Sequence, residues 1–197
     1  IAHIEELSKL SPYIKMYRNF DPKIILKHIG KITGEIDRQY VDFLLKTNGA
    51  SILDYCFLGL KNHTLGVNVY DNMRELWQSD CLLTFRFWGI VGTSSGENFG
   101  YIDEKDSSGN HYIGYYSANE PEHVYLVASS FNIFMDKFLK QVEASLAIDK
   151  NAIYIDNDWF LNPQKLIIDD IEMAQYLQSQ ETSEYNLLDR KFDKRKY

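Results

Sequence analysis

The sequence has little cysteine. Its 197 residues contain two, Cys56 and Cys81. They do not form a Cys-x-x-Cys pair, and no histidine stands near either one at the spacing of zinc ligands. Both lie beside apolar residues, so we expect buried, chemically inert thiols.

Long apolar runs are also missing. No stretch approaches the roughly 20 consecutive apolar residues that a membrane-spanning helix needs. Residues 1–11 mix apolar with charged side chains, unlike a signal peptide. We therefore expect no membrane partner, and a cytoplasmic location follows by default.

An excess of positive charge is absent as well. The chain has 21 Lys and Arg against 28 Asp and Glu, a formal net charge of -7. Direct nucleic-acid binding is not expected, because proteins that bind nucleic acid usually carry a basic stripe. An acidic surface suits a basic protein partner, although mild acidity is also ordinary among soluble cytosolic proteins.

Sequence patterns typical of catalysis are missing too. The glycines of Gly92–Gly100 do not have the spacing of a phosphate-binding loop, and no serine has the G-x-S-x-G context of a hydrolase nucleophile. No two histidines stand at the i, i+2 or i, i+4 spacing of zinc ligands; they are His3, His28, His63, His111 and His123. We expect no catalytic residue, no metal, no cofactor and no enzymatic activity.

What the sequence does contain is a β-rich centre. Hydrophobic residues make up 45% of the chain and aromatic residues 14%, enough for a sizeable core. Between Phe85 and Ala128, short β-forming runs alternate with Gly, Asn, Ser and Pro, which is typical of antiparallel hairpins. The predicted strands are Phe85–Gly92, Asn98–Asp103, His111–Ser117 and His123–Ala128.

Helices are predicted on both sides of this centre. Asp21-Pro22 has the cap-plus-proline signature of a helix start. A second helix is predicted from Glu35–Asp37 to a stop at Asn48-Gly49, where glycine suits the left-handed position after a helix. The other predicted elements are a strand over Ser51–Leu60, a helix over Asp71–Ser79 capped by Asp71, and a helix from Ser129 or Ser130 to about Ala147.

Residues 151–197 are predicted to extend a domain that spans residues 1–150. An edge strand is predicted over Ala152–Asp156, and Asn162-Pro163 begins the one helix predicted in this extension. The segment Asp189–Tyr197 is either a frayed tail or a docking segment for an acidic surface. It holds five basic residues, Arg190, Lys191, Lys194, Arg195 and Lys196.

Four features occur in an order and spacing that resemble a known family. They are the helix pattern Ile36-x3-Tyr40-x2-Phe43-Leu44-Leu45-Lys46-x-Asn48-Gly49, the apolar strand Ser51–Leu60, the glycine-punctuated hairpin Gly92–Asp103, and the run Val127–Phe131 that leads into the helix Phe134–Leu139. From about Ile24 to Glu143 the chain resembles the SUKH superfamily, specifically its Smi/Knr-type domain. It departs from the pattern at Ala50, where a second glycine is usual, and at Gly96-Glu97, where Gly-Asp is common.

The resemblance implies an α+β fold, with a single twisted, mainly antiparallel sheet flanked by helices and, here, a C-terminal helical extension. Bacterial members are largely immunity proteins that bind and neutralise a cognate toxin, often a nuclease, and a fungal member regulates cell-wall assembly. Our first hypothesis is a non-catalytic immunity protein. The alternative is a regulatory or scaffolding module without a toxin partner, and a small hydrolase or nuclease is a third possibility.

Candidate partner-binding residues lie in and around one predicted hairpin. The carboxylates of Glu97, Asp103, Glu104 and Asp106 would mimic phosphates for a basic toxin, or they are simply solvated turn residues. Tyr101 and Tyr115 join them, because tyrosine gives a large contact area at low entropic cost. Either one face of the predicted sheet exposes its tyrosines, or helices cover both faces.

Overall fold

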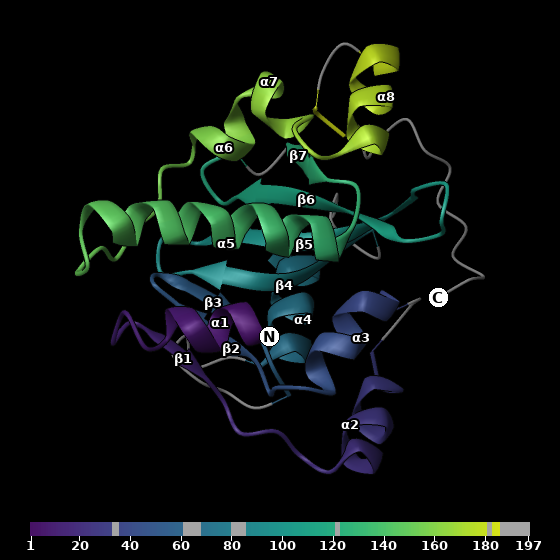
Figure 1. Ribbon diagram of the computed structural model, residues 1–197. Helices are drawn as coiled ribbons and strands as arrows, with labels where there is room; N and C mark the ends of the chain where they lie inside the picture. Colours follow the sequence, from purple (N-terminus) through teal and green to yellow (C-terminus); the bar gives the residue numbers. More distant parts are fainter. Residues whose placement is uncertain (33–35, 61–67, 80–85, 121–122, 181–182, 186–197) are drawn as a thin grey trace.

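The architecture is α+β and is built on one antiparallel sheet. The computed structural model describes residues 1–32, 36–60, 68–79, 86–120, 123–180 and 183–185. Within these ranges, seven strands follow one another across the sheet in chain order, each antiparallel to its neighbours (Figure 1). They are β1 (Ile14–Met16), β2 (Ala50–Ile52), β3 (Tyr55–Phe57), β4 (Phe87–Thr93), β5 (Glu97–Lys105), β6 (His111–Ser117) and β7 (Val124–Ala128). The expected fold class is confirmed.

Eight helices are formed by the residues that the structure describes. The longest, α5, has 18 residues and lies across one face of the sheet (Figure 1). The helices are α1 (Ala2–Leu7), α2 (Pro22–Ile29), α3 (Arg38–Leu44), α4 (Val69–Ser79), α5 (Phe131–Ile148), α6 (Asp158–Leu161), α7 (Pro163–Leu166) and α8 (Ile171–Gln180).

Two predicted helix starts are confirmed by their side-chain caps. The Asp21 carboxylate accepts a hydrogen bond from the backbone N–H of Lys23 at 2.7 Å, and Pro22 is the first residue of α2. Ser130 caps α5 by accepting from the N–H of Ile133 at 3.4 Å. Each cap satisfies a backbone donor that has no partner within its helix.

Two other predicted helix boundaries are wrong, the end of α3 and the start of α4. The helix α3 stops at Leu44, four residues before Asn48-Gly49. Gly49 does adopt a positive φ of 90°. It does not end the helix; instead it lets the backbone pass close to β3, since a Cβ there would lie 2.4 Å from the carbonyl oxygen of Phe57. The helix α4 is capped by Asn68 instead of Asp71, because the Asn68 side chain accepts from the N–H of Asp71 at 3.0 Å.

The segment predicted as one strand over Ser51–Leu60 is a hairpin of β2 and β3. The chain reverses at Leu53, whose φ is 56°. Its N–H donates to the carbonyl oxygen of Tyr13 at 3.0 Å, which fixes the turn against the residue before β1. A leucine in the left-handed region leaves no trace in a sequence pattern, because Gly, Asn and Asp are the usual residues there.

Helices cover both faces of the central sheet. Neighbouring residues of a strand point to opposite faces, and Asn98 and Phe99 of β5 show what lies on each. The Asn98 side chain accepts from Asn72 of α4 at 3.1 Å, whereas the Phe99 ring packs against Phe134 of α5 at 5.3 Å between centroids. Of the two alternatives expected for the sheet, the structure therefore shows the one in which helices cover both faces. The tyrosines at the centre of the sheet are buried: Tyr101, Tyr112, Tyr115 and Tyr116.

The extension after residue 150 contains three short helices, α6, α7 and α8, where one helix was predicted. The break between α7 and α8 falls at Asp169, which has a φ of 57°. The Asn162-Pro163 start of α7 is confirmed, with Asn162 accepting from the N–H of Gln164 at 3.0 Å. The predicted edge strand over Ala152–Asp156 is wrong, because this stretch has no strand conformation.

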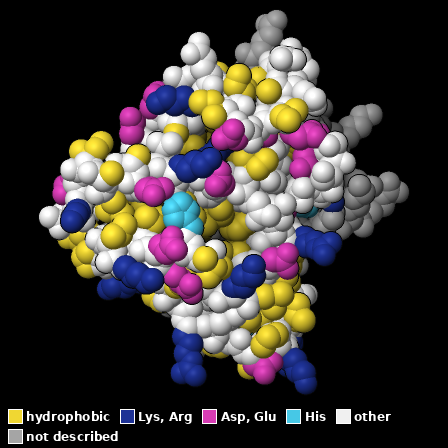
Figure 2. Space-filling view, viewed as in Figure 1, with side chains coloured by type: hydrophobic (Ala, Val, Ile, Leu, Met, Phe, Trp, Pro, Cys, Tyr) yellow, Lys and Arg dark blue, Asp and Glu magenta, His cyan; other side chains and the backbone are white. Residues whose placement is uncertain are grey.

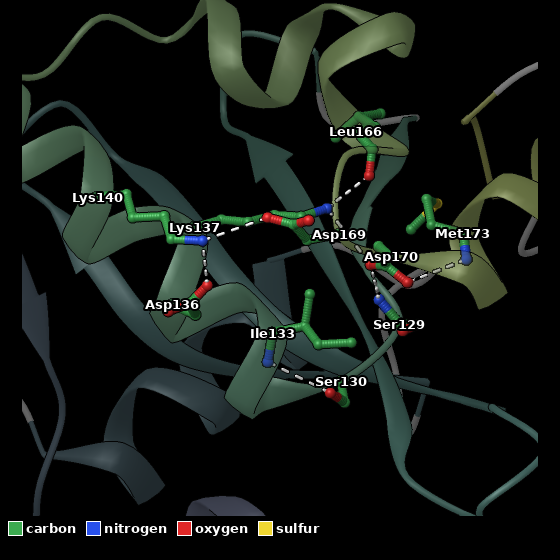
Figure 3. A network of polar contacts seen from close by, with 10 residues as sticks. All are labelled: Ser129, Ser130, Ile133, Asp136, Lys137, Lys140, Leu166, Asp169, Asp170 and Met173. Carbon is green, nitrogen blue, oxygen red and sulfur yellow. Dashed lines mark hydrogen bonds and ion pairs between the residues drawn. The ribbon is translucent and has the colours of Figure 1, made fainter.

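A buried ion pair fastens the extension to α5 (Figure 3). Asp170 is 1% exposed and accepts from the N–H of Met173 at 3.1 Å and of Ser129 at 3.0 Å. Its other partner is the ammonium of Lys137, 3.4 Å away, which also donates to the carbonyl oxygen of Leu166. Burial lowers the pKa of Lys137, and Asp170 opposes that shift. One carboxylate thus joins the end of β7, α5 and the start of α8.

A second attachment lies along the edge of the sheet. The residues 183–185 run antiparallel to β7, with Ser183 accepting from the N–H of Leu126 and Tyr185 donating its N–H to Val124, both at 2.7 Å. The Tyr185 hydroxyl then donates to Asp103 at 2.8 Å. Cys56 is buried, as expected, whereas Cys81 and the basic segment Asp189–Tyr197 lie outside the described residues.

Replacing the buried carboxylate tests this attachment. We expect Asp170→Ala to lower the free energy of unfolding by about 3–5 kcal/mol, because Lys137 would remain buried without its counter-charge. The exposed pair of Asp136 with Lys140 provides the control, and Asp136→Ala should cost roughly 0–1 kcal/mol. Urea denaturation measures both values, and equal losses would contradict the assigned role of Asp170.

Candidate functional site

The structure separates the six predicted contact residues. Glu97 opens β5, while Asp103 and Glu104 lie near its end and Asp106 follows it. Since a strand rises about 3.3 Å per residue, Glu97 and Asp103 are about 20 Å apart. The four carboxylates therefore do not form one acidic patch.

The carboxylates at the far end of β5 are engaged by the chain itself. Asp106 accepts from the N–H of Ser108 at 2.9 Å and from that of Asn110 at 2.7 Å, which closes the turn between β5 and β6. Asp103 accepts from Tyr185, as described above. These two side chains hold loops in place, while Glu104 is half-buried beside them.

Tyr101 belongs to the core. Its side chain has no exposed surface, and its ring stacks on Trp88 with 5.2 Å between centroids. The prediction that Tyr101 contributes to a contact surface is therefore not compatible with its position.

Glu97 and Tyr115, in contrast, lie together in a pocket of about 430 Å³. Three strands meet there, because Glu97 is paired with Ser117 across β5 and β6, and Tyr115 is paired with Tyr125 across β6 and β7. The extension supplies the remaining wall. The lining residues are Glu97, Tyr115, Ser117, Asn119, Glu120, Tyr125, Phe160, Leu161 and Ser183.

Tyrosine hydroxyls point to both carboxylates of this pocket. Tyr115 donates to Oε1 of Glu97 at 2.9 Å, and Ser95 donates to Oε2 at 3.4 Å. Tyr125 lies 3.5 Å from Oε2 of Glu120, too far for a strong hydrogen bond. Burial and the carboxylate of Glu97 raise the pKa of Tyr115 to about 12, and the pKa of Tyr125 is raised as well, by burial and then by Glu120.

The lining of the pocket carries two negative charges, those of Glu97 and Glu120. In the part of the chain that the structure describes, no lysine or arginine forms an ion pair with Glu97 or Glu120. On the face that α5 covers, Lys and Arg side chains lie between Asp and Glu, and several pair with them (Figure 2). The carboxylates of the pocket thus differ from those around α5 in having no described lysine or arginine partner, and we take the pocket as the candidate site for a cationic partner.

Two other pockets do not have carboxylates that lack a basic partner. One, of about 330 Å³ beside α4, contains Arg74 already paired with Asp71 at 3.2 Å. The other, of about 230 Å³ between α5 and α7, is lined by Lys137, Lys140 and Lys165, which pair with aspartates. Across the described ranges, no group of three or more His, Cys, Asp or Glu is placed to hold a metal ion, and no described helix has the length and apolarity to cross a membrane.

Sequence reasoning found two of the pocket residues and missed the others. Glu120 lies in the turn after β6, a turn that the sequence does mark with Asn119-Glu120-Pro121. That Glu120 lines the same pocket as Glu97 follows only from the pairing of β5, β6 and β7. Phe160 and Leu161 come from α6, which has no cap-plus-proline signal of its own.

Comparison with known proteins identifies the domain that holds most of the pocket. The model of the SMI1 / KNR4 family (SUKH-1) matches residues 29–137, more than half of the chain. A search of curated proteins finds no match. The match includes Glu97, Tyr115 and Glu120, whereas Phe160, Leu161 and Ser183 lie beyond it.

The contact between Tyr115 and Glu97 can be tested by titration. We expect Glu97→Gln to lower the pKa of Tyr115 from about 12, yet to leave it above 10 because burial persists. The raised pKa stabilises the fold fully below pH 10, and this contribution is lost as the pH rises through 12. The ¹³Cζ shift of Tyr115 reports its ionisation. Glu6→Gln, which changes an exposed carboxylate in α1, should leave the titration unchanged, and an identical curve for Glu97→Gln would contradict the contact.

Proposed function

Since the chain belongs to the SMI1 / KNR4 family (SUKH-1), we propose that it is a non-catalytic immunity protein that binds a cognate toxin, a nuclease, and neutralises it. The observation that supports this proposal is the pocket at the meeting point of β5, β6 and β7, where Glu97 and Glu120 have no cationic partner among the described residues. Binding, and no chemical step, would account for its action.

The charge of the pocket suits a nuclease as partner. A nuclease holds the phosphates of its substrate with basic side chains, and two carboxylates in one pocket offer the same basic groups a competing anionic surface. Of the four carboxylates first expected to do this, Glu97 remains in the proposal and Glu120 joins it. Asp103 and Asp106 leave it because they hold loops of the chain, and Glu104 leaves it because it lies near the opposite end of β5 from Glu97.

The overall charge would act at longer range. With a net charge of -7, the protein attracts a basic partner before contact and so raises the association rate, an effect that salt screens over about 10 Å at 0.1 M. The same charge keeps free nucleic acid away, so the protein would not compete for the toxin's substrate.

The family is equally consistent with a regulatory or scaffolding module that has no toxin partner. The two functions differ in what the neighbouring genes encode and in what the protein captures. A toxin gene next to the gene for this chain, and protection of cells that express that toxin, belong to the first function alone.

Co-expression with the product of a neighbouring toxin gene tests the proposal. We expect growth to be restored and the two proteins to co-purify. The double variant Glu97→Gln/Glu120→Gln should bind at least ten-fold more weakly at low salt, about 1.4 kcal/mol, and its affinity should depend less on salt. Isothermal titration calorimetry at two or more salt concentrations measures both effects.

The control variant for this experiment is Glu5→Gln/Glu6→Gln, which removes the same charge from exposed positions of α1. Its affinity should stay close to that of the unchanged protein. Failure to bind or protect against any toxin encoded beside the gene would contradict the proposed function. Equal loss of affinity in both double variants would assign the effect to net charge and not to the pocket.

A further inference from the structure

We propose that the pocket receives one arginine side chain of the partner protein, an inference that rests on the proposed function. The pocket combines two carboxylates that form no ion pair with a described residue, an aromatic wall, and an exposed leucine at its rim. Each of these features favours a guanidinium group carried by a protein over other cationic ligands.

The carboxylate oxygens have acceptor capacity to spare. Among the described residues, Oε1 of Glu97 accepts from Tyr115 at 2.9 Å, and the one partner of Oε2 is the Ser95 hydroxyl at 3.4 Å. The Glu120 carboxylate has, within the same residues, the Tyr125 hydroxyl at 3.5 Å. An ionised donor would approach such oxygens to about 2.7–2.9 Å. A guanidinium has five N–H groups in a planar fork, enough donors for more than one carboxylate oxygen.

The walls favour a flat cation. The rings of Tyr115 and Phe160 pack against each other with 4.8 Å between centroids, which leaves them only 8% and 2% exposed, so the aromatic face open to a ligand is that of half-buried Tyr125. Phe160 is held in place by an edge contact with Phe99 at 5.3 Å, and Tyr115 by its hydrogen bond to Glu97. A guanidinium is weakly hydrated and stacks on aromatic faces, whereas the ammonium of lysine keeps its water more strongly.

The rim indicates that the cation belongs to a protein. Leu161 is 58% exposed at the mouth of the pocket, where only a ligand that continues beyond its cationic group would cover it. A volume of about 430 Å³ also lies in the usual range for ligand sites, roughly 300–1,000 Å³. A free amino acid would satisfy the carboxylates and leave Leu161 in water.

Binding of small probes to the whole protein tests the inference. The probe is Nα-acetyl-arginine amide, and its matched control is Nα-acetyl-citrulline amide, which has nearly the same shape without the charge. At the ligand efficiency of ordinary ligands, a probe of this size binds with a Kd on the order of 1 mM. We expect saturable shifts of the backbone amides of Ser117, Asn119 and Glu120 in ¹⁵N–¹H spectra. The citrulline probe should bind at least ten-fold more weakly, and Nα-acetyl-lysine amide several-fold more weakly.

Variants connect the binding to the pocket. Glu97→Gln/Glu120→Gln should abolish the saturable shifts, and Tyr125→Leu, at the half-buried ring of the pocket, should reduce affinity for the arginine probe more than affinity for the lysine probe. Glu5→Gln/Glu6→Gln should bind the arginine probe as the unchanged protein does. Equal binding of the citrulline probe, or binding that survives Glu97→Gln/Glu120→Gln, would overturn the inference.

The two experiments separate failure of the arginine inference from failure of the proposed function. If the toxin is bound and neutralised while the arginine probe does not bind, the arginine inference is wrong and the immunity function stands. If the probe binds as expected but no toxin is bound, the partner assignment is wrong together with the proposed function.

Discussion

The alignment of β5, β6 and β7 is the constraint on which the rest of the molecule depends. It pairs Glu97 with Ser117 and Tyr115 with Tyr125. A shift of β5 by one residue would move Glu97 to the α4 face and Asn98 into the core under α5, because side chains alternate between faces. Burial on both faces makes such a shift costly, so the packing that stabilises the fold also fixes the geometry of the pocket.

Four carboxylates of this chain illustrate two distinct roles. Asp170 and Asp106 each accept hydrogen bonds from two backbone N–H groups, so their carboxylates stabilise the fold itself. Glu97 and Glu120 accept mainly from side-chain hydroxyls, which leaves room for a further donor. Sequence composition counts all four alike, yet of these four only Glu97 and Glu120 have room for a donor from a partner. This difference explains why an acidic net charge alone does not locate a site.

The sequence predicts elements well where backbone chemistry marks them. The strand His111–Ser117 agrees residue for residue, and the starts of α2, α5 and α7 follow from side chains that cap helix N–H groups. The failures at Leu53 and Asp169 share one cause, a positive φ at a residue other than glycine. At Leu53 the conformation is fixed by a contact with Tyr13, far away in the sequence, so no local pattern reveals it. Aspartate is common in the left-handed region, but Asp169 stands inside a stretch whose apolar spacing is helical. The predicted strand is therefore a hairpin, and the predicted helix is two helices.

The site was harder to predict than the fold, because its residues come from separate parts of the chain. Glu97 and Tyr115 stand in strands that sequence patterns locate, but Phe160 and Ser183 reach the pocket only because the extension packs onto α5 and along β7. Most of the pocket therefore lies in the family domain, while the extension supplies a separate wall. Under the proposed function, the carboxylates of the domain would provide attraction to a basic partner, and the wall would select the shape that is accepted. Changes in α6 would then alter which partner binds without altering the sheet.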